Sequence, residues 1–253
     1  MTGVWGLTFG SVLFAGVVVL AAGFVQSTAG FGFALLAVPL LSLAIPPQTA
    51  IVVVFLHATG SSLVTATHRR GDVDRVEATR LSLGAVVAMP LGALFLVTAS
   101  TGTLRLALGI VTCSAAAYML LPATGRRPEL VVRPWATYSV GAASGILNTA
   151  LATNGPPLVL YLRARGLAVT AFRGTISAVF VVSDVVGLAI LLGTGAVHAP
   201  AVHYFVLTLA PAAVGWSVGN ATASRLRHHH FVRMVDLILL VSGALAIAKA
   251  FLG

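Results

Sequence analysis

Apolar residues in this chain form long runs and do not alternate with polar ones. Ten runs can be marked, and most have the length that a helix needs to cross a bilayer, about 20 residues. They cover residues 7–22, 31–45, 48–66, 79–98, 103–121, 135–151, 155–162, 170–192, 200–219 and 231–251. A membrane β-barrel would need alternation with a period of two, which stretches such as 51–56 lack. The pattern predicts an all-α polytopic integral membrane protein with about eight to ten membrane helical segments.

Two stretches of this pattern are interrupted by glycine and proline. They are residues 7–45 and residues 135–162. The interrupting residues are Gly23, Gly30, Gly32 and Pro39 in the first stretch, and Gly141, Gly145, Asn154, Gly155, Pro156 and Pro157 in the second. Such a density of glycine and proline breaks a helix, and broken backbone persists in a membrane only where protein or a wet cavity satisfies it. Each stretch is therefore predicted to form a broken or re-entrant helix pair.

The two broken stretches come into register under a fixed shift of 124 residues. The shift places Gly32 on Pro156 and needs no gap from Phe31 onward. The matching order of runs and breaks predicts two repeats within a single integral membrane domain. The first repeat covers residues 1–122 and the second covers 133–253, with a polar connecting loop at 122–134.

The basic residues favour one of two topologies. If each broken stretch crossed the membrane once, 8 basic residues would lie on one side and 7 on the other. If each stretch returns to its starting side, the loops at 67–80, 122–134, 163–173 and 220–230 share one side. These loops and the helix ends beside them hold 13 of the 15 basic residues, as the positive-inside rule expects. The repeats then have inverted topology, as in many secondary transporters, and both termini lie outside the cytoplasm.

The composition restricts the classes of molecule that the chain is expected to contact. Only 8% of the residues are charged and 58% are hydrophobic, whereas soluble domains carry about 25% charged residues. The net charge of +9 is spread singly and in pairs between the apolar runs, so we predict contact with membrane lipid and none with nucleic acid. Lone Cys113 forms no disulfide framework, and the adjacent His228, His229 and His230 do not face one point on a helix, so no metal site or cofactor is predicted. The first apolar run is interpreted as an uncleaved helix.

Small polar residues gather at both breaks. Half-helix N-termini near Gly30 and Gly155 would present unpaired N–H groups and positive dipole ends, which bind an anion without a buried lysine. The residues predicted to bind substrate are Gln26, Thr28, Gly30, Gly32, Asn148, Thr153, Asn154, Gly155, Pro156 and Arg173. Two alternatives stay open: the glycines serve only close helix packing, or Arg173 is an interfacial anchor. Arg163 and Arg165 are expected to serve topology alone.

Two ionisable residues lie inside membrane runs. Asp184 falls near the middle of run 170–192, and His57 near the middle of run 48–66. The 124-residue shift places His57 on Val181, one helical turn from Asp184. Ionisable groups within a membrane are costly and indicate function, so both are proton-coupling candidates. A hydrogen-bonded polar pair with a purely structural role is the alternative.

Three stretches of the sequence have a family likeness. They are Gly23–Pro39, the pair Pro46-Pro47 with Ala50 behind it, and Asn154-Gly-Pro-Pro-Leu-Val-Leu-Tyr161 followed by Phe172-Arg-Gly-Thr175. With these residues the sequence resembles the TauE/SafE family of sulfite exporter-like membrane proteins, over essentially the whole chain. The resemblance implies a transporter of small anions, especially sulfur oxyanions and organosulfonates. No motif fixes the substrate.

The leading hypothesis is a secondary transporter of small anions in the cell membrane. The anion would bind at the broken helices near the midplane, and alternating access would carry it across. The sequence has no GxxxxGK[ST] motif for ATP, so an ATP-driven pump is not expected. An anion channel is the alternative, and an intramembrane enzyme is a weaker one, because no nucleophile with a base and no metal-binding pair is found. Coupling to protons, simple facilitated export and a homo-oligomeric state stay open.

Overall fold

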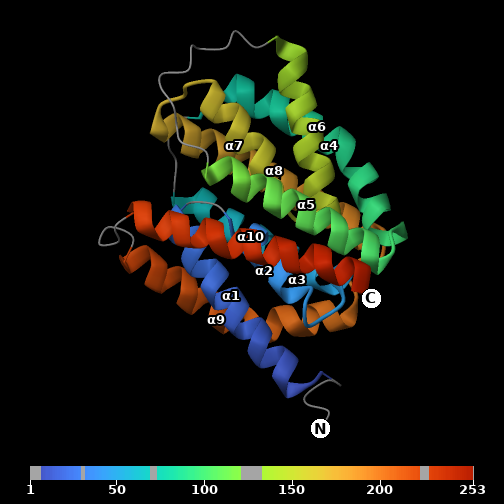
Figure 1. The fold of residues 1–253 in the computed structure, drawn as a ribbon. Helices are drawn as coiled ribbons and strands as arrows, with labels where there is room; N and C mark the ends of the chain where they lie inside the picture. Colours follow the sequence, from blue (N-terminus) through green and yellow to red (C-terminus); the bar gives the residue numbers. More distant parts are fainter. Residues whose placement is uncertain (1–6, 30–31, 69–72, 121–132, 223–227, 253) are drawn as a thin grey trace. The chain divides into compact units, whose positions relative to one another are not determined.

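The computed structural model describes residues 7–29, 32–68, 73–120, 133–222 and 228–252. These residues form ten helices and no strand, which confirms the all-α prediction. The helices are α1 (Phe9–Ala29), α2 (Phe33–Leu41), α3 (Pro47–His68), α4 (Arg75–Thr98), α5 (Thr101–Leu120), α6 (Pro134–Leu151), α7 (Gly155–Ala164), α8 (Val169–Gly193), α9 (Ala199–Thr222) and α10 (His228–Leu252) (Figure 1).

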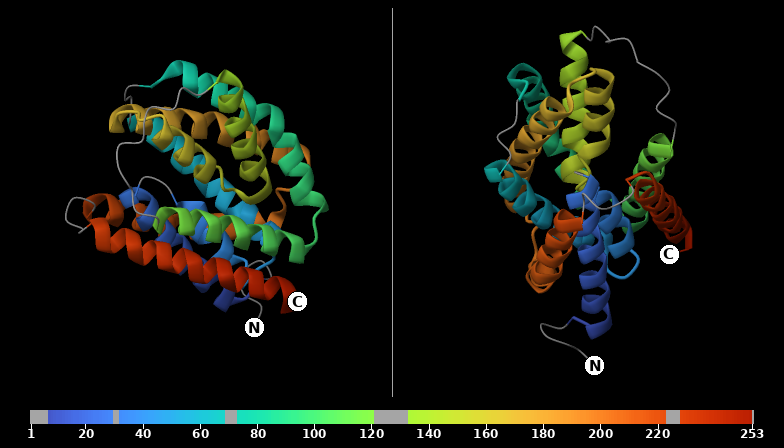
Figure 2. Two further views of the ribbon diagram at one scale, coloured as in Figure 1. Left: turned by 45° about the horizontal axis from the view of Figure 1, so that its top comes forward. Right: turned by 90° about the vertical axis from the view of Figure 1, so that its left-hand side faces the viewer.

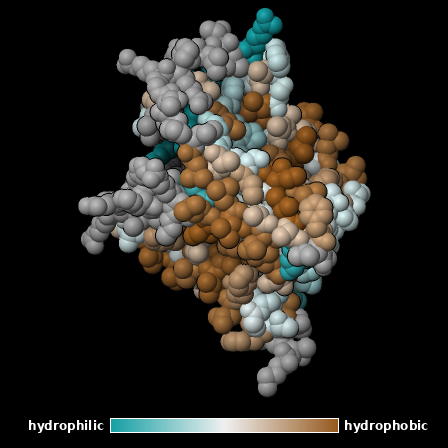
Figure 3. All heavy atoms as spheres, in the orientation of Figure 1, coloured by the Kyte–Doolittle hydropathy of each residue, from teal (hydrophilic) through white to brown (hydrophobic). Residues whose placement is uncertain are grey.

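Several helices have the length and hydropathy of membrane spans. Five qualify within the described residues: Phe9–Thr28, Pro47–Val64, Arg75–Thr98, Thr170–Gly193 and Ala199–Thr222. Their exposed side chains are apolar as well; Val87 of α4 is 80% exposed and Leu192 of α8 is 58% exposed. Most of the described side chains on the face drawn in Figure 3 are hydrophobic. A surface of this kind is stable in lipid and not in water, so the chain is a multi-pass membrane protein.

The helices group into two compact units. The α1–α9 unit contains α1, α2, Pro47–His57 of α3, α5, α9 and α10. The α4–α6 unit contains Ala58–His68 of α3 together with α4, α6, α7 and α8. Each unit takes helices from both of the predicted repeats, 1–122 and 133–253. The division of the chain into two repeats stays a prediction.

Helix α4 packs against α6 through glycines in the α4–α6 unit. A Cβ added to Gly84 would collide with the backbone carbonyl of Tyr138, and one added to Gly145 would collide with that of Ala85. The two backbones therefore touch directly, which maximises dispersion contacts where lipid provides no hydrophobic drive.

Glycines also allow close packing of helices in the α1–α9 unit. A Cβ at Gly215 of α9 would collide with the carbonyl of Leu20, and one at Gly219 would lie 2.7 Å from the carbonyl oxygen of Phe24. From the other side, a Cβ at Gly23 of α1 would lie 3.0 Å from the carbonyl oxygen of Ala212. Helix α5 pairs with α10 in the same unit, and Figure 2 shows the two side by side in both views.

Three glycines that were predicted to interrupt helices lie inside continuous ones. Gly23 lies within α1, and Gly141 and Gly145 lie within α6. Pro39 also lies within α2, where it occupies the last turn. A glycine keeps its backbone N–H, so its cost of about 1 kcal/mol in a helix is offset where its missing side chain lets another helix approach. For these three glycines the packing alternative is the correct one.

The second break is a short turn after α6. Helix α6 ends at Leu151, and Ala152 adopts the left-handed conformation with φ 56°. The N–H groups of Ala152 and Thr153 donate to the carbonyls of Asn148 and Leu147 at 2.8 and 3.1 Å. The first of these bonds is that of the αL motif, which satisfies a carbonyl of the last helical turn. The next helix, α7, begins two residues later at Gly155.

Helices α6 and α7 form an antiparallel hairpin. The hydroxyl of Ser144 donates to the carbonyl of Asn154 at 2.9 Å, and the hydroxyls of Thr137 and Tyr161 lie 2.6 Å apart. Thr137 precedes Ser144 by seven residues and Tyr161 follows Asn154 by seven, as in an antiparallel pair. The chain thus comes back toward the end at which α6 began (Figure 1), and the prediction of a broken or re-entrant pair is confirmed for this stretch.

Candidate functional site

The carboxylate of Asp184 is the centre of a buried polar cluster at the α6–α7 break. Asp184 lies in α8 and is 2% exposed. Ser62 of α3 donates its hydroxyl hydrogen to Oδ2 at 2.5 Å. The side-chain amides of Asn148 and Asn154 donate to Oδ1 at 3.3 and 3.4 Å. We call Ser62, Asn148, Asn154 and Asp184 the Asp184 cluster.

Two hydroxyls near this cluster are buried without a partner. Thr153 is 2% exposed, and its Oγ1 makes no hydrogen bond to any residue that the structure describes. The same is true of Oγ of Ser183, the residue before Asp184, within the described part of the chain. A buried hydroxyl without a partner costs about 1–3 kcal/mol. The position of Thr153 between two helices therefore indicates a binding position for a polar ligand.

The N-terminus of α7 differs from the expected one. Pro156 and Pro157 are the second and third residues of the helix, and proline has no N–H to donate. The first turn thus has the N–H of Gly155 but lacks the next two, and the Asn154 side chain makes no capping hydrogen bond. The positive end of the helix dipole remains. An anion at this end would need side-chain donors, which Asn148, Thr153 and Asn154 can supply.

The first break lies in the α1–α9 unit. Gly30 lies outside the described residues, and Gly32 caps α2 in a left-handed conformation with φ 103°. The hydroxyl of Thr28 donates back to the carbonyls of Phe24 and Val25, both at 2.9 Å. The side chain of Gln26 is partly exposed on the last turns of α1. Because the two breaks belong to different units, binding of one anion by both stays a prediction.

His57 lies next to the short helix of the α1–α9 unit. Its Nε2 is 2.8 Å from Oγ1 of Thr208, which in turn donates to the carbonyl of Tyr204 at 2.7 Å. The imidazole contacts two aromatic rings, with centroid distances of 5.8 Å to Phe33 and 4.8 Å to Phe205. Since the hydroxyl hydrogen of Thr208 is donated to the carbonyl of Tyr204, Nε2 of His57 is the donor in its hydrogen bond to Thr208. Phe33 is the first residue of α2, so His57 borders the first break.

Arg173 is not brought to the Asp184 cluster. Its side chain is exposed in the second turn of α8, 11 residues before Asp184. A helix rises about 1.5 Å per residue, so the two positions are roughly 16 Å apart along the axis. This placement suits the alternative of an interfacial anchor.

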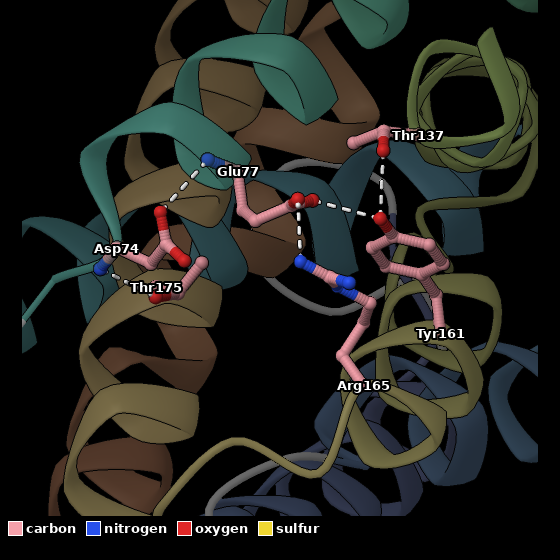
Figure 4. Close-up of polar contacts among 6 residues, drawn as sticks. All are labelled: Asp74, Glu77, Thr137, Tyr161, Arg165 and Thr175. Atoms are coloured by element: carbon pink, nitrogen blue, oxygen red, sulfur yellow. Dashed lines mark hydrogen bonds and ion pairs between the residues drawn. The ribbon is translucent and has the colours of Figure 1, made fainter. Parts of the chain in front are cut away.

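A second polar cluster, which the sequence did not suggest, holds the C-terminal end of α7 (Figure 4). Glu77 in the first turn of α4 is 4% exposed. Its Oε2 accepts a hydrogen bond from Tyr161 at 2.8 Å, and its Oε1 forms an ion pair with Arg165 at 3.2 Å. Tyr161 also contacts Thr137 of α6. We call Glu77, Thr137, Tyr161 and Arg165 the Glu77 cluster. Arg165 was expected to serve topology alone, and this expectation is wrong because the buried carboxylate of Glu77 needs a cation.

The beginning of α4 is fixed by a capping residue in the same region. Oδ1 of Asp74 accepts the N–H of Glu77 at 3.1 Å, as an N-cap does. The N–H of Asp74 donates to Oγ1 of Thr175 in α8 at 3.0 Å. Thr175 closes the Phe172–Thr175 motif, and Tyr161 closes the Asn154–Tyr161 motif, so the last residue of each motif connects its helix to the start of α4. The four-residue spacing of Tyr161 and Arg165 could have indicated the Glu77 cluster, because it places both side chains on one side of the C-terminal end of α7.

No metal centre is found in the described part of the chain, where no three His, Cys, Asp or Glu side chains converge. The backbone of His228, His229 and His230 starts α10, and their side chains lie outside the described atoms.

Comparison with known proteins places the chain in a family. The family described as "Sulfite exporter TauE/SafE" matches residues 15–246. A curated relative, the "Probable inner membrane transporter protein TsaS" of Comamonas testosteroni, is 26% identical over 120 residues. That match covers 47% of this chain and spans half the length, 50%, of the relative. No solved structure matches significantly. The matched region contains both breaks, the Asp184 cluster and the Glu77 cluster, and the chain thus belongs to the TauE/SafE family of membrane transporters.

Proposed function

We propose that the chain is a secondary transporter of small anions, of the sulfite or organosulfonate kind, and that it works by alternating access. The observation that carries this proposal is the group of neutral donors at the α6–α7 break. Asn148 and Asn154 supply amides and Thr153 supplies a buried hydroxyl without a partner. They surround the positive end of the α7 dipole, which is the usual anion site of transporters with broken helices.

The chemistry of the donors suits a sulfur oxyanion. A sulfonate or sulfite group presents three oxygens, each able to accept hydrogen bonds, and neutral donors bind it without the trapping that a buried lysine would cause. The family description names sulfite exporters, and the relative is named as an inner membrane transporter. The first name supports this class of substrate, and the second supports this membrane.

The hairpin of α6 and α7 supports the proposed orientation. Since this stretch returns toward its starting end, the loops and adjoining helix ends that hold 13 of the 15 basic residues share one side. We infer that this side is the cytoplasm and that both termini lie outside it. Helix pairing matches under the 124-residue shift as well, since α1 with α9 corresponds to α6 with α4, and this supports the two inverted repeats.

Thr153→Val tests the anion site. Valine keeps the volume of threonine and removes the hydroxyl, so the purified variant should fold but bind the anion more weakly. We expect a five- to tenfold weaker affinity, about 1–1.4 kcal/mol, for loss of one hydrogen bond. The measurement is thermal stabilisation by methanesulfonate and by sulfite in detergent. Thr98→Val is the matched control, because Thr98 is exposed and its hydroxyl donates only to its own helix at Leu94. Equal affinities for Thr153→Val and the control would remove Thr153 from the site.

A channel is the second candidate, and flux measurements separate it from a carrier. In proteoliposomes, a carrier shows saturable uptake, and unlabelled anion inside accelerates the entry of labelled methanesulfonate. A channel shows neither counterflow nor saturation at millimolar concentrations. Counterflow is the expected result, and its absence with rapid flux would favour the channel.

A further inference from the structure

The Asp184 carboxylate is held by neutral groups alone. Its hydrogen-bond partners are the hydroxyl of Ser62 and the amides of Asn148 and Asn154. The elements around it in the α4–α6 unit carry their described charged groups near one end: Asp74 just before α4, Arg75, Glu77 and Arg80 on α4, Arg133 just before α6, Arg163 and Arg165 at the end of α7, and Arg173 at the start of α8. Helix α6 and residues 58–64 of α3 have none. No described charged group of the unit therefore faces Asp184.

The same amides are needed by two negative groups. Asn148 and Asn154 donate to Oδ1 of Asp184, and they are also the main side-chain donors for an anion at the start of α7. An ionised Asp184 thus repels the anion and occupies its donors. A proton on Asp184 removes the charge and weakens its hold on both amides. Proton and anion therefore favour each other's binding at this break.

We propose that protonation of Asp184 opens the α6–α7 break to the anion, so that one proton moves with each anion; this rests on the proposed function. The proton comes from solution and bonds to a carboxyl oxygen of Asp184, and it leaves to solution on the other side of the membrane. Ser62 can serve both states, because a hydroxyl donates to the carboxylate and accepts from the protonated acid. With a monoanion bound, the protonated site has the same net charge as the empty ionised site, and the transport cycle is electroneutral.

The first experiment measures protons taken up on binding. Methanesulfonate is a suitable probe because it stays a monoanion across the accessible pH range, so that pH dependence belongs to the protein. Purified protein in weak buffer with an indicator dye should take up about one proton per methanesulfonate bound at a pH where Asp184 is ionised. Its affinity should fall about tenfold for each pH unit above that point.

The second experiment uses Asp184→Asn, which imitates the protonated acid. In proteoliposomes this variant should exchange labelled methanesulfonate but lose accumulation driven by a pH gradient, by tenfold or more, and its affinity should not vary with pH. Asp74→Asn is the matched control: it removes another carboxylate of the unit, and asparagine caps a helix as well as aspartate. The control should keep proton-driven accumulation.

Several results would overturn the inference. Methanesulfonate binding without proton uptake would refute the coupling and leave the anion site standing, as would binding that requires Na⁺ at constant pH. Gradient-driven accumulation by Asp184→Asn at the wild-type level would also refute it. No binding of methanesulfonate or sulfite at any pH would refute the proposed function itself. The proton-uptake measurement uses the wild-type chain, so its absence refutes the coupling even if Asp184→Asn does not fold.

Discussion

At the scale of single residues, the sequence identifies some members of the candidate site but not how they come together. Asn148, Asn154 and Asp184 could each be singled out, since polar groups in membrane segments indicate function. Their meeting in one cluster could not be predicted, because 30 residues separate Asn154 from Asp184 and no periodicity links them. Glu77 was not singled out for the same reason: 84 residues separate it from Tyr161, and only the structure shows it buried against Tyr161 and Arg165.

Tyr161→Phe tests the importance of the Glu77 cluster at this scale. The change removes a hydrogen bond to a buried carboxylate and leaves Thr137 without its partner. We expect a loss of about 1–3 kcal/mol in the free energy of unfolding in detergent. Thermal unfolding followed by circular dichroism measures this loss. Tyr138→Phe is the control, because the Tyr138 side chain is 41% exposed; a similar loss in both variants would contradict the role given to Tyr161.

Helices illustrate a different limit. The ranges of long apolar helices such as α4 and α9 follow directly from the runs of apolar residues. The breaks were harder, since a glycine that permits close packing looks the same in sequence as one that ends a helix. Gly145 touches the backbone of α4, whereas α6 ends at Leu151 and the left-handed residue that follows is Ala152, an alanine and not a glycine. Whether a glycine permits close packing or ends a helix depends on the partner helix, and the local sequence does not identify that partner.

Gly145→Ala tests the packing of α4 on α6. The added methyl group would collide with backbone atoms of Ala85, which cannot move aside as a side chain can. We expect a loss of about 1–3 kcal/mol in the free energy of unfolding, as overpacking usually costs. Gly60→Ala is the matched control, since no atom lies within 4 Å of its added Cβ and alanine favours a helix. Thermal unfolding in detergent should separate the two variants, and equal stability would contradict the direct contact of the backbones.

At the scale of the whole molecule, composition and run lengths sufficed to predict a polytopic membrane protein of helices. The grouping of these helices could not be predicted, because each compact unit takes helices from both halves of the chain. Sequence order indicates which helices are neighbours along the chain, whereas packing depends on small-residue surfaces that match across long separations, such as Gly215 with Leu20.

The orientation of the chain can be tested with cysteines introduced on either side of α8. With Cys113 replaced by alanine, Thr194→Cys should react with a membrane-impermeant maleimide in intact cells. Ala168→Cys should react only after the cells are made permeable, because the loop before α8 carries basic residues and is assigned to the cytoplasm. Both positions are exposed at helix ends. The opposite labelling pattern would show that the membrane orientation is reversed.

The division into units also has a consequence for biosynthesis. All helices of the α4–α6 unit precede α9 and α10 in the chain, whereas α1 of the other unit packs on α9, which is made late. Chains are elongated at about 5–20 residues per second and compact units fold as they emerge. The α4–α6 unit can therefore assemble in the membrane before α9 and α10 have been synthesised. Helix α1 is made before these helices and pairs with α9 late, so the face of α1 that packs on α9 has no α9 to contact until α9 is made.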